Sequence, residues 1–460
     1  MVGVSLKKKP GDEGREAEAL AWEKARLWAE YHESLGDYSH AEQWLQRALV
    51  LAWQQNDERR LARVQIKLGT IAWRQGEFDH AQEALQIALA HASAPTAAPS
   101  AATERADALY ALGLVNRQQA RFEEAQRCFS EDLALRAANP NPEREARALN
   151  AMGNMRAVLR DPVGALDFFQ RALAIRRAIG DRSGIGSSLL AIGQCYSSMA
   201  RLAEAESMLR EALRIQRATR NRFQECLVGN ELGIVQWLCG QYAAAEATLQ
   251  ASLDIAQALE STMLESYVLC NLGQVQRDAT LAVAGDASPP NPAGTAQAIA
   301  TLERGLAMAL DQEDRQLAAI YQSDLALALH LAGEHARALL AVDEAARTYR
   351  SIAQEKELTT VLPTRARILL TLGERNSAVA TAHAAIALLD AVADELPEFA
   401  HRDYYYSGTV LAACNETAAA NRAFATARRL LLHRAEQITS DALRDSFLHN
   451  VPHNRALLVV

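Results

Sequence analysis

An alanine recurs through almost the whole chain at intervals of 40 residues or more. The ten alanines are Ala41, Ala81, Ala125, Ala165, Ala205, Ala245, Ala298, Ala338, Ala378 and Ala420. A glycine stands twelve residues before six of them, at Gly69, Gly113, Gly153, Gly193, Gly233 and Gly408, and Gly273 precedes Ala298 at a greater distance. Paired small residues let two antiparallel helices joined by a tight turn approach closely, so the chain is expected to be an array of helical hairpins.

Length and composition agree with such an array. A globular chain of 460 residues would divide into about three domains, whereas a repeat array buries its core between neighbouring units and has no such limit. Aromatic residues make up only 6%, and no long alternation of β-branched residues indicates strands, which favours an all-α fold. The net charge of −8 argues against sequence-independent binding of nucleic acid, because phosphate binding needs a basic surface.

The cysteines and the N-terminal residues indicate a cytoplasmic protein. The six cysteines stand singly, with no pair at metal-ligand spacing, as small buried residues do in a reducing compartment. Lys7, Lys8 and Lys9 precede Pro10 and an acidic stretch, without the apolar segment of a signal peptide. No uninterrupted apolar run has membrane-spanning length, so we expect no membrane partner.

Each unit carries an apolar stripe on a first helix and another on a second helix. With Gly69 as position 8, the first helix has apolar residues at positions 3, 7, 10 and 14, and the second has alanine at 20, a large apolar residue at 24 and a small one at 27. Position 15 is often glycine, where a helix end favours a left-handed residue. These glycines are Gly36, Gly76, Gly240, Gly333 and Gly373.

This pattern resembles the tetratricopeptide repeat, which has Leu-Gly at positions 7 and 8, Ala at 20, Phe or Leu at 24 and Ala at 27. Ten units between about residues 16 and 437 match it. The units are longer than the usual repeat and are similar to those of Leu-Gly-Asn adaptors, kinesin light chains and Rap-type peptide receptors. The resemblance implies an α-solenoid of about ten hairpins, an open right-handed superhelix in which each repeat contacts only its neighbours.

The repeat pattern predicts three parts: a disordered segment of residues 1–15, a superhelix of residues 16–437, and a C-terminal capping helix and tail of residues 438–460. Residues 281–294 insert into repeat seven and are expected to form a projecting mobile loop, while residues 91–103 join repeats two and three. Solenoids tolerate both as plain surface insertions.

A proline and the chain's last residues break the repeat pattern. Pro363 lies within the first helix of repeat nine, which is expected to start late, at or near the proline. A short capped helix with a polar surface is predicted to close the array at its C-terminal end. Residues 444–455 resemble the C-terminal tail of large bacterial signalling proteins in which a helical-repeat arm follows an ATPase or cyclase module.

The first helices of the hairpins line the concave surface of such a solenoid, with positions 2, 5, 9 and 12 pointing into its groove. Positions in the groove include Arg63, Trp73, Tyr110 and Arg147, and the partner-binding candidates are Arg117, Asn150, Asn154, Gln194, Asn230, Trp237, Gln274 and Arg277. Carboxamides can donate to and accept from a peptide backbone, and arginines grip carboxylates in a bidentate manner. Asn150, Asn154 and Asn230 match the groove asparagines of the resembling adaptors and Rap-type receptors. The alternative is that an exposed helix face is polar without recognising anything.

Five of the six tryptophans lie in the first two repeats. They are Trp22, Trp28, Trp44, Trp53 and Trp73. A free solenoid end should be polar, so this crowding indicates self-association or contact with another domain. The alternative is that the tryptophans fill the core of the terminal repeats.

The sequence contains no motif that indicates catalysis. It lacks a glycine-rich phosphate loop and a His-Glu-x-x-His motif, and Pro452 separates His449 from His453. We therefore expect no enzyme, no cofactor and no metal site. Two functions stay open: an autonomous scaffold that binds a protein or peptide segment in its groove, or the sensory arm of a signalling ATPase or transcription regulator acting with a separate effector module.

Overall fold

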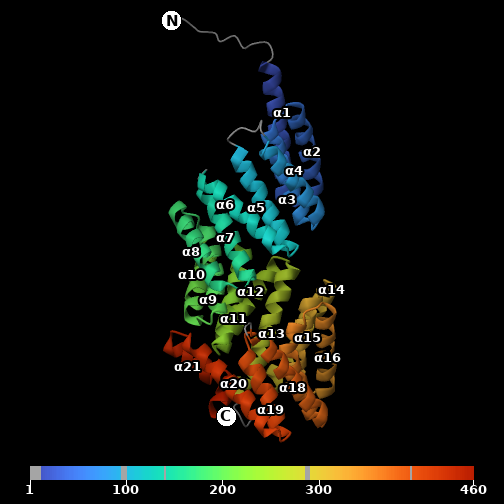
Figure 1. Cartoon of the computed structure of the whole chain (residues 1–460), viewed down its shortest axis with the longest axis vertical. Helices are drawn as coiled ribbons and strands as arrows, with labels where there is room; N and C mark the ends of the chain where they lie inside the picture. The colour runs from blue at the N-terminus through green and yellow to red at the C-terminus, as the bar shows by residue number, and fades with distance from the viewer. Residues whose placement is uncertain (1–11, 95–100, 139–140, 285–290, 394–395) are drawn as a thin grey trace. The chain divides into compact units, whose positions relative to one another are not determined.

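The computed structural model describes residues 12–94, 101–138, 141–284, 291–393 and 396–460 (Figure 1). These residues form helices joined by short turns and contain no strand. The chain divides into two compact units, Met1–Asp181 and Arg182–Val460, which are called unit 1 and unit 2. The all-helical content and the succession of packed hairpins confirm the expected α-solenoid fold class.

The part of unit 1 that the structure describes forms four hairpins, each made of two consecutive helices that pack against each other. Its helices are α1 (Asp12–Ser34), α2 (Tyr38–Gln54), α3 (Glu58–Arg74), α4 (Phe78–Ala92), α5 (Ala102–Gln118), α6 (Phe122–Ala138), α7 (Pro142–Val158) and α8 (Pro162–Ile179). The expected disordered segment lies largely outside the described residues, and α1 begins at Asp12.

The described residues of unit 2 form six hairpins, the 3₁₀ turn η2 (Glu355–Glu357) and two short C-terminal helices. Its helices are α9 (Arg182–Ser198), α10 (Leu202–Ala218), α11 (Arg222–Leu238), α12 (Tyr242–Ala258), α13 (Thr262–Ala284), α14 (Pro292–Asp311), α15 (Arg315–Leu331), α16 (His335–Ser351), α17 (Leu358–Thr371), α18 (Arg375–Ala391), α19 (Ala400–Ala413), α20 (Thr417–Glu436), α21 (Asp441–His449) and α22 (Pro452–Val459).

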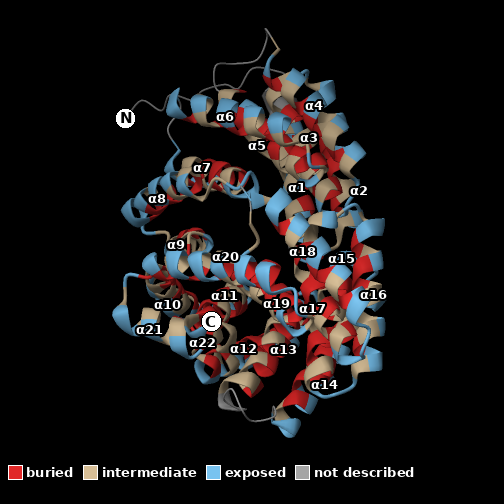
Figure 2. Ribbon diagram, turned by 60° about the horizontal axis from the view of Figure 1, so that its bottom comes forward, coloured by how far each residue is buried: buried red, intermediate tan, exposed pale blue. Residues whose placement is uncertain are grey.

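The repeated glycine is where the two helices of a hairpin come closest. A Cβ added to Gly113 would lie 2.5 Å from the Phe129 ring, and one added to Gly153 would lie 2.5 Å from the Phe169 ring. Glycine at position 8 therefore faces the large apolar side chain at position 24. The buried faces of the helices turn toward each other within the hairpins (Figure 2), so most of the core consists of these helix-to-helix contacts.

The turns inside the hairpins contain left-handed residues, as the glycines at position 15 predicted. Gly36, Gly76, Gly240, Gly333 and Gly373 all have positive φ, between 72° and 85°. In the third, fourth and fifth hairpins the corresponding turn places a residue other than glycine at a φ of 57°. The left-handed conformation is thus a property of the turn, and glycine only removes its steric cost.

The first helix of repeat nine does not begin at the proline, contrary to the sequence expectation. Helix α17 starts at Leu358 and includes Pro363 in its second turn. The proline removes one hydrogen bond, from its missing N–H to the carbonyl of Thr359. The first turn forms nevertheless because Leu358 and Val361 are buried, which offsets the lost bond.

The predicted loop at residues 281–294 is shorter in the structure than in the sequence interpretation. Helix α13 continues to Ala284, and α14 begins at Pro292 with Asn291 as its N-cap. The Asn291 side chain accepts a hydrogen bond from the backbone N–H of Ala293 at 3.2 Å. Residues 281–284 continue α13 because they are good or neutral helix formers with no proline or glycine, and residues 285–290 lie outside the described part of the chain.

Candidate functional site

In unit 1 the first helices of the hairpins line one pocket on their shared face, which is called the inner surface of unit 1. The pocket has a volume of about 380 Å³. Its lining includes Glu33, Ile66, Lys67, Thr70, Trp73, Arg74, Asp107, Tyr110, Ala111, Leu114, Arg144 and Arg147. Trp73, Tyr110 and Arg147 were predicted to lie in a groove, and the structure brings them to the same pocket.

Two carboxylates of this pocket are shared among basic side chains. Glu33 accepts from Lys67 at 2.9 Å and from Arg74 at 2.8 Å. The Asp107 carboxylate accepts hydrogen bonds from Arg144 and, at 3.1 Å, from Arg136. The ion pairs of Lys67, Arg74 and Arg144 connect successive hairpins, and these three basic side chains line the pocket. Arg136 is buried and belongs to the same hairpin as Asp107.

Arg147 makes the inner surface of unit 1 positively charged. Its guanidinium carbon lies 5.0 Å from the centre of the Tyr110 ring, and its side chain is exposed. The pocket is lined by four cationic side chains and two carboxylates. Its local charge is therefore +2, in a chain whose net charge is −8. An aromatic floor below an exposed guanidinium suits a ligand that carries a carboxylate.

The three predicted site residues of unit 1 continue this surface beyond the pocket. Asn150 and Asn154 follow Arg147 on α7 by three and seven residues, and Arg117 follows Tyr110 on α5 by seven, so they share the face of those residues. The Oδ1 atom of Asn150 is buried and accepts no hydrogen bond. Arg117 is half-buried and forms no ion pair with a described residue.

Most of the predicted site residues of unit 2 are bonded to other groups of the same unit. Asn230 is 9% exposed, and its Oδ1 accepts a 2.9 Å hydrogen bond from Asn271. The indole N–H of Trp237 donates to Oδ2 of Asp278 at 3.0 Å, and its ring centre lies 5.3 Å from that of Phe399. Neither Asn230 nor Trp237 presents an open surface to a partner in this conformation.

Arg277, which was predicted to hold a partner's carboxylate, binds two carboxylates of its own unit. It is 1% exposed and donates to Asp278 at 2.7 Å and to Asp324 at 2.5 Å. Burial lowers the pKa of this guanidinium, but the two carboxylates outweigh burial and raise the pKa, so the group is charged. Gln274 donates to the same Asp324 at 2.6 Å, whereas Gln194 is an exposed side chain on α9.

The C-terminal segment, residues 438–460, packs across helices from the middle of unit 2. The Ser446 hydroxyl donates to the carbonyl of Cys239 at 2.6 Å, immediately after α11. A Cβ added to Gly240 would lie 2.9 Å from Cβ of Asn450, so glycine permits this close approach. Helix α22 also contacts α13, α19 and α20.

These contacts correct two sequence expectations. The segment is not only a polar cap, because Phe447, Val451, Asn454 and Leu457 are all buried. Nor does each repeat contact only its neighbours, because the segment links the last hairpin to helices more than 200 residues earlier. The sequence indicated a short capped helix in the segment, but nothing in a repeat pattern identifies which distant helices it will contact.

Two imidazoles, one buried (His401) and one half-buried (His453), lie among arginines where the C-terminal segment meets α19. The ring centres of His401 and His453 are 5.4 Å apart. Burial, followed by the neighbouring His453 and nearby guanidiniums, holds the pKa of His401 well below its usual range. Burial also comes first in lowering the pKa of His453, followed by the guanidiniums of arginines on α19, α13 and α17. The facing cations are Arg277, Arg367, Arg402 and Arg434. Both histidines are therefore neutral in the packed state.

Burial shifts the pKa of one carboxyl group in the same region, that of Asp403, in the upward direction. Burial raises the pKa of Asp403 to about 6, against the attraction of Arg402, whose Nε lies 3.1 Å from the carboxylate. The inner part of unit 2 is thus a buried polar cluster in which protonation states depend on close packing.

The tryptophans of the first repeat are partly core and partly surface. Trp22 is 1% exposed, whereas Trp53 is 71% exposed. Trp28 and Trp44 stack with ring centres 5.9 Å apart, and Trp28 is 42% exposed. Core packing therefore accounts for Trp22, while Trp28 and Trp53 are exposed, and the predicted self-association or domain contact stays a prediction.

Several cysteines are unsuited to nucleophilic chemistry. Burial raises the pKa of the Cys195 and Cys226 thiols to about 11 and that of Cys239 to about 12. A thiol of this kind is protonated at neutral pH and is a poor nucleophile. No helix among the described residues is long and apolar enough to cross a membrane.

Comparison with known proteins identifies the class of protein that these hairpins define. Three similar solved structures are the apo form of RapI (16% identity, TM-score 0.51, covering 64% of this chain and 99% of that one), the apo form of the quorum sensor NprR from B. thuringiensis (15%, 0.57, 82% and 99%), and a STAND signal-transduction ATPase with a tetratricopeptide repeat sensor from Pyrococcus horikoshii (17%, 0.53, 72% and 47%). At these identities the likeness establishes the fold, an α-solenoid of helical hairpins.

The family of the repeats follows from the sequence itself. The tetratricopeptide repeat family model matches residues 104–178 and, in a second register, residues 144–218. The hairpins between residues 104 and 218 therefore match the tetratricopeptide repeat, as the sequence resemblance indicated. A sequence comparison with proteins of curated function gave no match.

Proposed function

We propose that this chain is a protein- or peptide-binding scaffold that holds an extended segment of its partner on the inner surface of unit 1. The observation that carries the proposal is the row of half-buried polar side chains beside the pocket: Asn150 and Asn154 share the helix face of Arg147, and Arg117 forms no ion pair with a described residue. A peptide backbone offers the N–H and C=O groups that carboxamides bind regardless of sequence.

The charge of this surface defines the partner's chemistry. Arg147 is exposed above Tyr110, and the pocket has a local charge of +2. We therefore propose that the bound segment carries carboxylates, from acidic side chains or a C-terminus, close to an aromatic or aliphatic side chain that fills the pocket.

Unit 2 has a different role in this proposal. Its candidate residues Asn230, Trp237, Gln274 and Arg277 serve an internal network, and the C-terminal segment packs beside them. A partner could reach these groups only by displacing part of that network. Binding by unit 2 would then depend on release of the C-terminal segment.

A second candidate function is a sensory or regulatory arm that acts with a separate effector module. The observation that favours it is the apolar surface of the first hairpin, where Leu20, Leu27, Trp28, Leu35 and Trp53 are between 42% and 72% exposed. Such a surface suits self-association or contact with another domain. The structural likeness to a STAND ATPase that has a tetratricopeptide repeat sensor agrees with this candidate in fold alone.

We place the scaffold in the cytoplasm and assign it no catalytic role. The six cysteines are free thiols, and four of them are buried, as is usual in a reducing compartment. The thiols with raised pKa values are not activated nucleophiles.

Selection from a displayed random-peptide library tests the proposed chemistry. The full-length chain should enrich acidic segments, and Arg147→Glu should abolish that enrichment because it reverses the charge above the pocket. Arg127→Glu is the matched control, since Arg127 lies on the second helix of its hairpin, where its side chain is 70% exposed. Enrichment that responds equally to both substitutions would contradict the proposed surface.

A further inference from the structure

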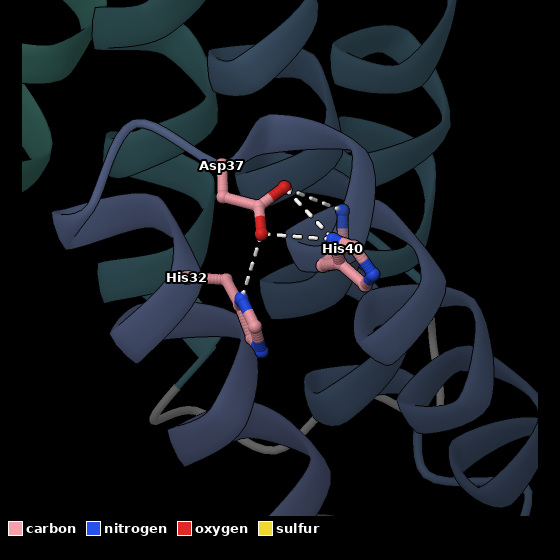
Figure 3. A group of neighbouring side chains, drawn as sticks. All are labelled: His32, Asp37 and His40. Carbon is pink, nitrogen blue, oxygen red and sulfur yellow. Dashed lines mark hydrogen bonds and ion pairs between the residues drawn. The ribbon is translucent and has the colours of Figure 1, made fainter.

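The turn of the first hairpin brings together two imidazoles and a carboxylate. His32 lies in the last turn of α1, Asp37 is the N-cap of α2, and His40 lies in the first turn of α2 (Figure 3). One possible ligand atom from each lies within 4.8 Å of the others. This is the only such group of three found among the described residues.

We propose that His32, Asp37 and His40 bind a divalent transition-metal ion of the Zn²⁺ type. Two imidazole nitrogens and one carboxylate oxygen form a donor set that suits Zn²⁺ and its neighbours, whereas Mg²⁺ and Ca²⁺ prefer oxygen alone. The sequence gave no expectation of a metal site, because His-x4-Asp-x2-His is not a recognised ligand spacing.

The three side chains need only small movements to become ligands. Asp37 Oδ2 lies 3.0 Å from Nδ1 of His32 and 2.8 Å from Nδ1 of His40. Ligand atoms held about 2.1 Å from a tetrahedral ion are about 3.4 Å apart. The imidazole planes are inclined by 22°, with ring centres 5.2 Å apart, so both nitrogens already face the same carboxylate.

The two oxygens of Asp37 have separable roles. Oδ1 accepts the backbone N–H of His40 at 3.3 Å and so caps α2, and it also lies 3.0 Å from Nδ1 of His40. Only Oδ2 contacts both imidazoles. A metal ion can replace the imidazole contacts of Oδ2 without removing the cap. The side chains of His32 and His40 are 20% and 59% exposed, which leaves room for a water molecule as fourth ligand.

The second hairpin provides an internal comparison. Its turn has Glu77 and His80 at the positions of Asp37 and His40, with a 3.1 Å contact between them. Ala72 stands where the first hairpin has His32, so the third ligand is missing. A carboxylate and a histidine in this turn are therefore an ordinary ion pair, and His32 is the residue that adds a metal site to it.

A bound ion would fasten the first helix of the array to the second. Helix α1 is the first helix of the array and packs mainly against α2. Ions that bind only the folded hairpin stabilise it by mass action. The exposed apolar residues of α1 would then be presented on a fixed helix when metal is bound.

Zinc titration of the untagged full-length chain tests the proposal. The Trp28 ring lies 6.1 Å from that of His32, so tryptophan fluorescence reports on this turn, and calorimetry gives the stoichiometry. We expect saturable binding of one ion per chain and a higher melting temperature of the first hairpin. Cobalt should produce the visible absorption of a site with nitrogen and oxygen ligands.

Variants separate this site from adventitious binding. His32→Ala and His40→Ala should each weaken zinc binding by at least about tenfold, and Asp37→Asn should weaken it while keeping the N-cap. His80→Ala should leave zinc affinity unchanged. Absence of saturable binding at excess zinc, or equal affinity in the His32→Ala/His40→Ala double variant, would overturn the proposal. Circular dichroism of each variant shows whether it is folded.

Discussion

Replacing Phe447 by alanine is expected to release the C-terminal segment from unit 2. The Phe447 side chain is 3% exposed, and its ring centre lies 6.4 Å from that of His401. Truncating a buried phenylalanine costs about 3–5 kcal/mol. Helix α21 has nine residues and is too short to be stable alone. The lost packing energy therefore lowers the free energy that separates the packed segment from the released one.

Hydrogen–deuterium exchange of the full-length chain measures this release. A loss of about 3–5 kcal/mol raises the open population by roughly a hundredfold to several thousandfold, and exchange of the α21 amides should accelerate by that factor. Asp445→Ala is the matched control, because its side chain is 77% exposed on the same helix and its ion pair with His449 is worth little. Unchanged exchange in the Phe447 variant would refute the packing derived for this segment.

Three further predictions concern pH, a close contact and the first repeat. Because His401 and His453 have pKa values held below their usual range, the folded unit binds fewer protons at these groups than the unfolded chain near pH 6, and unit 2 should lose stability in thermal melts as pH falls below about 6.5. The raised pKa values of Asp403 and Glu231 partly offset this loss at lower pH, because these carboxyls bind protons more readily in the folded unit. Gly153→Ala should destabilise unit 1 by about 1 kcal/mol in denaturant titrations, since overpacking against the facing phenylalanine exceeds the gain in helix propensity. Trp22→Ala should cost about 3–5 kcal/mol of stability, whereas Trp53→Ala should change it by less than about 0.5 kcal/mol.

The local architecture could be predicted because the same residue type recurs in successive repeats wherever the same physical requirement recurs. Gly113 and Gly153 recur where a ring of the second helix needs space, and Gly76 and Gly240 recur where the turn needs positive φ. Helix boundaries that depend on burial were less predictable: α17 starts before Pro363 because its first turn is buried.

The candidate site was predicted unevenly for a physical reason. Tyr110 and Arg147 follow from helix periodicity alone, since residues on one face meet residues on the next hairpin. The partners of Arg277, by contrast, come from α13 and α15, and the C-terminal segment reaches Cys239 from across the unit. Periodicity describes contacts between neighbouring helices and contains no information on contacts between helices far apart in the sequence.

The affinity for a selected peptide, measured on variants of the inner surface of unit 1, tests the central claim most directly. The Asn150→Ala/Asn154→Ala double variant should bind the peptide at least about tenfold more weakly, at the cost of two backbone hydrogen bonds, and should melt at nearly the same temperature. Gln170→Ala, an exposed change on the second helix of the same hairpin, should keep the full affinity. Full affinity in the double variant, or a loss that appears only together with a lower melting temperature, would contradict a peptide-binding role for this surface.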